Sequence, residues 1–369
     1  MFNNSRFLRR IDLPLIIAVA ILILIGIVII GSATHVNTPG NERYWYVQRQ
    51  SIFALIGAAL VFIMMKFDYR MLQPLGNKLY IFNAILLLAV DIAGHSALGA
   101  QRWIQIGPIS FQPSEFSKLI MIISLAALLE NRVGKLNTFK DLLPVALYLI
   151  VPFCLVVTQP DLGTALVFLA IFFGMIFAAG VNMRLIAILF GFGLSLLPIF
   201  WHFLKDYQKM RIMVFINPNI DPLGSGYHII QSKIAIGSGL LFGKGLFQGT
   251  QSQLNFLPEN HTDFIFAVIG EETGFIGTAI VLLIFLFLLW RGMRIAREAS
   301  DNFGILLAVG VNSMLAFHVL VNVGMTIGIM PVTGIPLPFI SYGVSSLITN
   351  ILSMGLLLNI YNNRQQLIF

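Results

Sequence analysis

Long apolar stretches alternate with short polar connections along almost the whole chain. The first, 13–30, consists of apolar residues apart from Pro14 and Gly26, so a helix there is long enough to cross the roughly 30 Å hydrocarbon core of a bilayer. Sliding windows of about 19 residues find ten such stretches, near 13–32, 50–67, 74–93, 115–130, 142–158, 163–181, 184–204, 263–291, 304–328 and 344–361. The pattern predicts an all-α polytopic membrane protein with ten transmembrane helices.

Basic residues are distributed unequally between the two sides of this predicted bundle. An even number of helices puts both termini on one side. The short connections on the other side carry only Arg43, Arg49, Arg102 and Lys118. The side of the termini carries fourteen basic residues, namely Arg6, Arg9, Arg10, Lys66, Arg70, Lys78, Arg132, Lys135, Lys140, Arg184, Arg291, Arg294, Arg297 and Arg364. Because Lys and Arg accumulate in cytoplasmic loops, both termini are predicted to be cytoplasmic.

Two segments depart from the pattern of short connections. Residues 205–262, between the seventh and eighth helices, form a long extracytoplasmic loop, and the mixed polar and apolar residues 227–238 within it favour a short interfacial helix. Residues 330–346 contain three prolines and two glycines and no charge. That density of breakers predicts a tucked or re-entrant outer loop. We treat 1–369 as a single membrane domain.

Composition agrees with this picture. The chain is 57% hydrophobic and 11% charged, with a mean hydropathy of +0.87, which excludes a soluble globular domain. The net charge of +7 is spread over the connections, so topology and anionic lipid explain it better than a nucleic-acid partner does. Cys154 is the only cysteine, so no intramolecular disulfide can form. The first apolar stretch is longer than a signal-peptide core, which favours an uncleaved anchor.

Carboxylates gather in 258–277, a polar loop that runs directly into the eighth apolar stretch. Ionisable groups within a spanning segment are costly and often mark function. Asp263 stands at the wet outer end of the stretch, whereas Glu271 and Glu272 lie deeper. For the two glutamates we favour a structural role, such as pairing with a buried Lys or Arg. Asp263 is the candidate for catalysis.

Two other outer elements contain charged residues at the same membrane boundary. The first, 101–118, carries Arg102, Glu115 and Lys118, and the second, the turn 158–164, carries Asp161. Simpler interpretations exist for both acids, because Glu115 suits the first turn of a helix and Asp suits turns. Basic groups beside isolated carboxylates at an outer face are what a lipid-linked phosphate substrate requires. The cations would neutralise pyrophosphate, and a carboxylate would act as general base on a sugar hydroxyl.

Three other sequence patterns give weaker support for a functional site. The stretch 237–245 resembles a phosphate-binding loop, but Ser238 stands where the first glycine is required and Gly245 replaces the Ser or Thr after Lys244. The six histidines are scattered without the spacing of a zinc site. A polar stripe at helical spacing in the ninth apolar stretch favours interhelical hydrogen bonds over a proton path; it consists of His318, Asn322 and Thr326.

Six ordered motifs, covering nearly the whole length, resemble the SEDS family (shape, elongation, division and sporulation), most closely its rod-shape branch. They are GAQRWIQIGPISFQPSEFSK (99–118), QPDLGTALV (159–167), YQKMRI (207–212), DPLGSGYHIIQSKIAIGSG (221–239), FLPENHTDFIFAVIGEETG (256–274) and PLPFISYG (336–343). Members commonly read SYGGS and EELG where this chain has 341–345 SYGVS and 271–274 EETG. The valine at 344 disfavours a positive φ at that position.

The resemblance implies a peptidoglycan glycosyltransferase in the bacterial cytoplasmic membrane, which polymerises lipid II into glycan strands at the outer face during cell elongation. The family's essential Asp falls on Asp263. The resemblance places Arg102, Glu115, Lys118 and Asp161 at positions implicated in function, and Glu259 in the same loop as Asp263. With the basic residues that could stabilise the departing pyrophosphate, the residues predicted to bind the substrate and its pyrophosphate are Arg102, Glu115, Lys118, Asp161, Arg211, Lys233, Lys244 and Glu259. The implied partners are a monofunctional class B penicillin-binding protein that acts as transpeptidase, and other membrane proteins of the elongation machinery.

The mechanism that fits these residues is an inverting transfer. Asp263 would deprotonate the acceptor GlcNAc hydroxyl, which attacks the anomeric carbon of a donor carried on undecaprenyl pyrophosphate. The sequence requires no cofactor; a divalent cation on the pyrophosphate is compatible with it, but no ligand spacing calls for one. Two alternatives stay open: a lipid II flippase that uses the same cavity, with Glu271, Glu272 and His318 as a proton path, and a scaffold that only positions the transpeptidase.

Overall fold

The structure, a computed structural model, describes residues 11–36, 44–93, 95–97, 100–107, 109–222 and 224–364. Its helices are α2 (Leu13–Thr34), α3 (Trp45–Met64), η2 (Tyr69–Leu75), α4 (Gly76–Ala93), α5 (Pro113–Leu129), η3 (Glu130–Arg132), α6 (Phe139–Thr158), α7 (Leu162–Ala178), α8 (Met183–Ser195), α9 (Leu197–Phe203), α10 (Asp206–Ile216), η4 (Pro218–Ile220), α11 (Ser225–Ser238), α12 (Thr250–Gln253), α13 (Ile265–Glu298), α14 (Asn302–Ile327) and α15 (Val344–Asn362). An α-helix therefore lies at each of the ten predicted stretches, with the seventh divided into α8 and α9.

Seven helical stretches among the described residues are long and apolar enough to cross a membrane: α2, α3, α6, Met183–His202 (α8 with most of α9), α13, α14 and α15. Helix α7 is apolar but shorter. The apolar stretches form helices because a helix hydrogen-bonds its own backbone N–H and C=O groups. The hydrocarbon core of a bilayer offers these groups no partners. The chain is an integral membrane protein.

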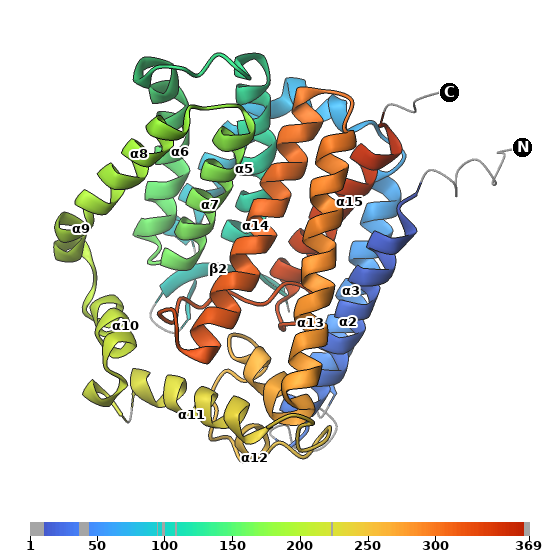
Figure 1. The fold of residues 1–369 in the computed structure, drawn as a ribbon, viewed down its shortest axis with the longest axis vertical. Helices are drawn as coiled ribbons and strands as arrows, with labels where there is room; N and C mark the ends of the chain where they lie inside the picture. The colour runs from blue at the N-terminus through green and yellow to red at the C-terminus, as the bar shows by residue number, and fades with distance from the viewer. Residues whose placement is uncertain are drawn as a thin grey trace, which may run out of the picture.

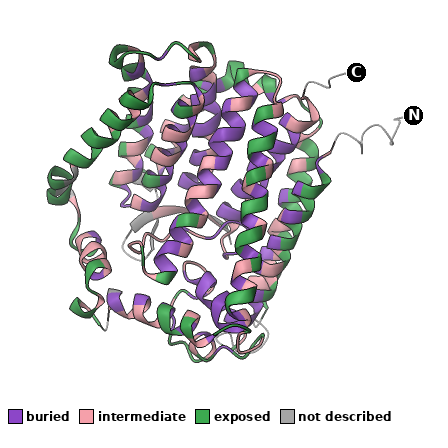
Figure 2. Ribbon diagram, viewed as in Figure 1, coloured by how far each residue is buried: buried purple, intermediate pink, exposed green. Residues whose placement is uncertain are grey.

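Helix α14 lies at the centre of the bundle and packs against α5, α7, α13 and α15 (Figure 1). Most of it is buried, whereas α8 is mostly exposed and has no buried residue (Figure 2). Small residues permit the close packing: a Cβ added at Gly310 would lie 2.8 Å from Ile122 and 2.9 Å from Met175. Only glycine at this position lets α14 approach α5 and α7 so closely.

A small antiparallel sheet, which the all-α prediction did not include, connects α4 to α5. Strands β1 (His95–Ala97), β2 (Ala100–Ile106) and β3 (Ile109–Phe111) pair in the order β1-β2-β3. Gly107, in the turn after β2, has a φ of 60°, a value that favours glycine. The strands were missed because they are short, and because β2 and β3 lie within a motif interpreted by its charges alone. The sheet positions Arg102, which lies on β2.

The long loop 205–262 contains the helices α10, η4, α11 and α12. They lie at one end of the molecule, opposite the start of α2 and the end of α15 (Figure 1). The predicted short helix at 227–238 is confirmed as part of α11. It contacts both α13 and α14, so this segment is an ordered part of the fold.

Helix α13 starts at Ile265 rather than at the predicted Asp263 and is interrupted at Gly274, whose φ is 65° and ψ −163°. The interruption leaves backbone groups without helical partners. The glycine-rich stretch 239–245 supplies hydrogen-bond partners for these groups. The N–H groups of Lys244 and Gly245 donate to the carbonyls of Glu271 and Glu272 at 3.0 Å. The apparent phosphate loop is therefore a backbone cap for the kink of α13.

The breaker-rich segment between α14 and α15 is a tucked loop, 328–343, as predicted. Phe339 and Ile340 are buried, and a Cβ added at Gly26 of α2 would lie 2.7 Å from the Ile340 Cα. Gly343 is the N-cap of α15, and Val344 is its first helical residue. The valine is accommodated because this position is helical and needs no positive φ.

Candidate active site

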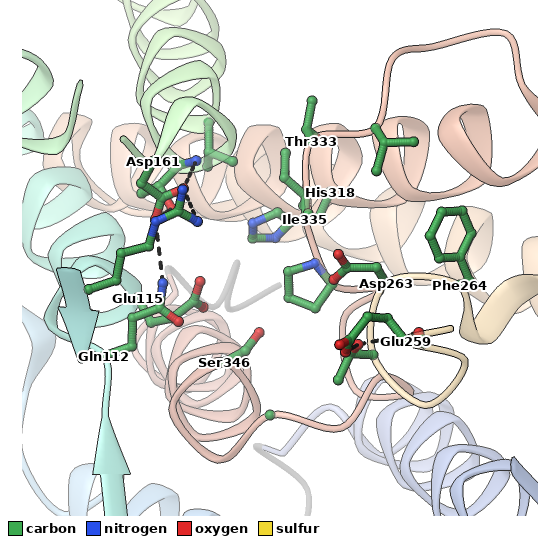
Figure 3. Close-up of a pocket in the computed structure, with 18 of the residues that line it drawn as sticks. Gln112, Glu115, Asp161, Glu259, Asp263, Phe264, His318, Thr333, Ile335 and Ser346 are labelled. Carbon is green, nitrogen blue, oxygen red and sulfur yellow. Dashed lines mark hydrogen bonds and ion pairs between the residues drawn. The ribbon is translucent and has the colours of Figure 1, made fainter. Parts of the chain in front are cut away.

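A cavity of about 520 Å³ opens between α5, α7, α10, α14 and the tucked loop. Seven of the nine residues predicted for the site line it: Arg102, Glu115, Lys118, Asp161, Arg211, Glu259 and Asp263. Figure 3 shows Glu115 and Asp161 on one side of the cavity, Asp263 and Glu259 on the other, and His318 between them. The charged residues of four separated motifs therefore share one space.

Asp263 precedes α13, and its half-buried carboxyl faces the cavity. Burial, and next the charge of Glu259, raise its pKa to about 6, although Arg211 and Arg102 act in the opposite direction. Loss of contact with bulk water disfavours the ionised form. A carboxyl group with such a pKa is largely ionised at neutral pH, yet it is a better proton acceptor than an ordinary exposed Asp.

The loop that carries Asp263 is fixed by hydrogen bonds to the tucked loop and α14. The Asn322 side-chain amide donates to the Asp263 carbonyl at 3.0 Å and to the Ile335 carbonyl at 2.8 Å. The Ser341 hydroxyl donates to the Thr262 carbonyl at 2.7 Å. Asn322 of the polar stripe thus joins α14 to two loops rather than to another helix, and it holds the catalytic candidate in place.

Arg102 and Asp161 form an ion pair at the opposite side, with 3.7 Å between Arg102 Nη1 and Asp161 Oδ1. Arg102 also donates to the carbonyls of Gln159 and Pro160. Asp161 is the N-cap of α7, because it accepts from the Thr164 N–H at 3.2 Å and the Thr164 hydroxyl at 2.9 Å. Asp161 therefore has a structural role, as a helix cap rather than as the predicted turn residue, and the same side chain lines the cavity.

Glu115, Lys118 and His318 form a buried cluster. Lys118 Nζ lies 2.8 Å from Glu115 Oε1 and 3.1 Å from His318 Nε2. Glu115 stands in the first turn of α5, which begins at Pro113 with Gln112 as N-cap. The sequence analysis predicted Glu115 and Lys118 as site residues. Their contact with His318 was missed, because 200 residues separate Lys118 from His318 and only their shared apolar surroundings linked them.

Arg211, on α10, is the cavity's cation with the fewest compensating charges. Its Nη1 donates to the Val332 carbonyl at 3.4 Å, and its guanidinium lies 5.7 Å from the Tyr207 ring centroid. Within the described part of the chain no carboxylate lies within 4.0 Å of Arg211. Arg102 and Lys118, by contrast, are each paired with an acid.

Two predicted pyrophosphate ligands lie outside this cavity, which corrects the sequence analysis. Lys244 Nζ is held 2.8 Å from Glu271 Oε1, and exposed Lys233 on α11 lies against Gly328 at the end of α14. Glu271 therefore pairs with a Lys as predicted, although Lys244 is half-buried rather than buried. Glu272 accepts a short hydrogen bond from the Ser32 hydroxyl. Both glutamates belong to the kink of α13 rather than to the cavity.

The described residues contain no group of three or more His, Cys, Asp or Glu side chains that could hold a metal ion. The cavity pairs acids with bases instead, and its lining also carries hydroxyl groups from Thr164, Ser345 and Ser346. This arrangement suits a large polar ligand that has both anionic and hydroxyl groups. A divalent cation carried in by such a ligand stays a prediction.

Comparison with known proteins finds relatives in the family that the sequence motifs resemble. The profile of the FtsW, RodA and SpoVE proteins, described as cell cycle protein, matches residues 13–366. The peptidoglycan glycosyltransferase MrdB of Escherichia coli (strain K12) is 40% identical over 348 residues, covering 94% of this chain and 94% of MrdB. Stage V sporulation protein E of Bacillus subtilis (strain 168) is 41% identical over 354 residues, covering 95% of this chain and 96% of that protein.

Solved structures are similar over the same length. A chain from work on the structural coordination of polymerization and crosslinking by a peptidoglycan synthase complex has a TM-score of 0.82 at 32% identity, covering 96% of this chain and 99% of its own. The crystal structure of the Thermus thermophilus rod shape determining protein RodA has a TM-score of 0.71 at 32% identity, with 96% and 98% covered. The chain therefore belongs to the FtsW/RodA/SpoVE family, the SEDS family that its motifs resemble.

Proposed function

We propose that this chain is a peptidoglycan glycosyltransferase that polymerises lipid II into glycan strands at the outer face of the cytoplasmic membrane during cell elongation. The observation that carries the proposal is the Asp263 carboxyl, which faces a cavity of about 520 Å³ with a pKa raised to about 6. A general base is most effective when its pKa lies near the working pH. Relatives named as peptidoglycan glycosyltransferases support the same activity.

Asp263 would remove the proton from the acceptor GlcNAc hydroxyl as that oxygen attacks the anomeric carbon of the donor. The bond to undecaprenyl pyrophosphate breaks, the configuration inverts, and pyrophosphate leaves as an anion. A direct displacement of this kind needs one base and no protonated leaving group. Asp263 is suited to that role because its side chain is held in the cavity by a loop fixed at Thr262 and at its own carbonyl.

Arg211 is the principal candidate for the departing pyrophosphate. No described carboxylate lies within 4.0 Å of it, so its charge is available, and it faces the same cavity as Asp263. Arg102 would assist, at the cost of weakening its 3.7 Å pair with Asp161. Fixed cations aimed at developing negative charge are among the largest contributors to catalysis.

The topology that this function needs has ten spans, both termini in the cytoplasm and the loop 205–262 outside. It is supported by the helices found at all ten apolar stretches, and by the basic residues concentrated on the side of the termini. It also agrees with the position of α10, α11 and α12 opposite the two ends of the bundle. In this orientation Asp263 faces the compartment where glycan is assembled.

The proposed partner is a monofunctional class B penicillin-binding protein, a transpeptidase that cross-links the new strand, with other membrane proteins of the elongation machinery. A similar chain comes from a peptidoglycan synthase complex that coordinates polymerization with crosslinking, which supports such a pairing. Any divalent cation would enter with the substrate pyrophosphate. Titration of the polymerisation reaction with a chelator tests that requirement.

The test is polymerisation of fluorescent lipid II by the purified chain with its transpeptidase partner. Asp263→Asn should reduce the rate at least about 100-fold, because Asn cannot accept the proton. Asp68→Asn is the matched control: Asp68 is exposed, lies outside the cavity lining and caps η2. It should leave the rate unchanged.

Polymer at the wild-type rate from Asp263→Asn would sink the assignment of the base. A wild-type complex that moves lipid II across liposome membranes but makes no glycan would indicate a flippase. A wild-type complex with neither activity would leave a scaffold as the function, so the three hypotheses give three different results.

A further inference from the structure

The cluster of Glu115, Lys118 and His318 contains two buried polar atoms that have no partner. Glu115 is 4% exposed and His318 1% exposed, and both line the cavity. Among the described residues, Glu115 Oε2 and His318 Nδ1 accept and donate no hydrogen bond. Buried polar groups are rarely left unpaired because each such group costs roughly 1–3 kcal/mol. The pair therefore points to a ligand.

The hydrogen bonds of the cluster determine which of these atoms is the donor. A lysine ammonium has only donors, so His318 Nε2, 3.1 Å from Lys118 Nζ, must be an acceptor. The ring proton then lies on Nδ1, the unpartnered atom. Glu115 Oε1 accepts from the same ammonium at 2.8 Å, which leaves Oε2 as a free acceptor. The cluster thus offers one N–H donor and one carboxylate acceptor.

The charge of the cluster argues against a phosphate ligand. Lys118 is compensated by Glu115, and both side chains are almost completely buried. An anion placed here would meet the Glu115 carboxylate as well as the ammonium, whereas no described carboxylate lies within 4.0 Å of Arg211 in the same cavity. A neutral ligand that has its own acceptor and donor on separate atoms fits better. A secondary amide has this arrangement, with a C=O to accept from Nδ1–H and an N–H to donate to Oε2.

We propose that Glu115 and His318 bind an acetamido group of the lipid II disaccharide, with Lys118 holding both side chains in position. This inference rests on the proposed polymerase function, since it names the part of the substrate that the cluster recognises. His318 becomes a specificity residue that the sequence motifs did not indicate. The proposal moves Lys118 from the pyrophosphate to the sugar, and leaves the pyrophosphate to Arg211 and Arg102.

The experiment measures kcat/KM of the chain with its transpeptidase partner for native lipid II and two analogues. In each analogue a hydroxyl replaces the acetamido group of one sugar, either GlcNAc or MurNAc. The wild type should prefer native lipid II over one of the two by about 10-fold or more. The replacement hydroxyl can still donate to Oε2, but the loss of the C=O leaves the buried Nδ1–H without its acceptor. The analogue that loses the preference identifies the sugar.

Two substitutions at His318 separate ligand binding from structure. His318→Gln keeps an oxygen near the Nε2 position for Lys118 but has no donor at the Nδ1 position, so the preference should fall about 10-fold. His318→Asn keeps an N–H near the Nδ1 position, so most of the preference should remain. A ratio of two substrates within one variant does not depend on how much of that variant is folded. Glu271→Gln changes a buried glutamate that pairs with half-buried Lys244 outside the cavity, and it should retain the wild-type ratio.

The proposal is overturned if the wild type shows no preference in either arm, or if His318→Gln keeps the full preference. A wild-type complex that makes no glycan contradicts the polymerase function alone. Binding of native lipid II and the two analogues, measured by fluorescence anisotropy, then gives the same comparison for the acetamido site without turnover.

Discussion

Glu115 and Glu271 are both buried, and each holds a lysine ammonium at 2.8 Å. Their other contacts differ. Glu271 accepts from the backbone N–H groups of Gln251 and Ser252 at 2.9 and 3.2 Å, and its second oxygen is bonded as well. Glu115 Oε2 has no partner among the described residues. The protein satisfies both oxygens of one carboxylate, while the other carboxylate belongs to a residue that lines the cavity and keeps one oxygen unpaired.

The difference shows how a structural carboxylate can be told from a functional one in this fold. A buried ion pair is costly to desolvate unless further hydrogen bonds satisfy it. At the kink of α13, backbone groups supply those bonds, so Glu271 holds the stretch 249–252 and the chain gains order. In the cavity the described residues supply no such bond to Glu115 Oε2, so this oxygen stays available for the proposed substrate contact. Burial and an ion-pair distance do not separate the two cases.

The largest expected difference is in the loss of stability when a glycine is replaced, either at the kink of α13 or in the cavity. A Cβ at Gly243, whose φ is 79°, would lie 2.1 Å from the Glu272 carbonyl oxygen, so Gly243→Ala should destabilise the fold by on the order of 3 kcal/mol. Gly334, in the cavity, also has a positive φ of 76°, but its Cβ would lie 3.4 Å from Asp263 Oδ2. Gly334→Ala should cost about 1–2 kcal/mol.

Thermal unfolding of the purified chain in nanodiscs measures both changes. Gly191→Ala, in α8, is the control, because a Cβ there meets nothing within 4 Å, and it should leave stability unchanged or raise it slightly. Equal losses from Gly243→Ala and Gly334→Ala would contradict the close packing assigned to the kink.

The second expected difference is in catalysis by the two glutamates. Glu115→Gln leaves buried Lys118 without its charge partner and removes a ligand contact, so kcat/KM per folded molecule should fall roughly 100-fold. Glu271→Gln should keep kcat/KM within about threefold of the wild-type value. Glu271 stabilises the kink of α13, so its substitution should lower the stability of the fold rather than the activity. Lipid II polymerisation, normalised to the folded fraction, measures both. A similar loss of activity in the two variants would remove the distinction.

The smallest expected effects are shifts in pH dependence. Since only ionised Asp263 accepts a proton and its pKa is about 6, kcat/KM of the wild type should fall as pH drops through about 6. Glu259 raises this pKa and Arg211 lowers it. Glu259→Gln should therefore move the acid limb to lower pH, and Arg211→Gln should move it to higher pH. Each shift should be within about one pH unit.

Rates of polymerisation between pH 5 and 8 measure these limbs, and the position of a limb does not depend on the maximal rate. Glu271→Gln supplies the control with an unshifted limb, because its charge does not act on Asp263. An acid limb that moves upward in Glu259→Gln would mean that another group controls the rate.

The sequence alone determined the helices and the position of the catalytic candidate. Apolar runs record which contiguous segments are buried or face lipid, so the ten helical stretches were predictable within a few residues. Asp263 stands where a polar loop meets an apolar run, a boundary that is visible locally. The breakers in 330–346 likewise predicted a non-helical tucked loop, because Pro and Gly act through their own backbone.

Only the tertiary structure decided which charges meet. Lys244 pairs with Glu271, and Lys118 meets His318 across 200 residues, because packing brings together segments whose spacing carries no record of the contact. The same holds for the unpaired oxygen of Glu115 and for the backbone cap that 239–245 places on α13. Local sequence specifies what each segment can bury, but partner choice depends on the summed packing of all helices at once. The function assigned to each carboxylate therefore depends on which groups the folded chain places beside it.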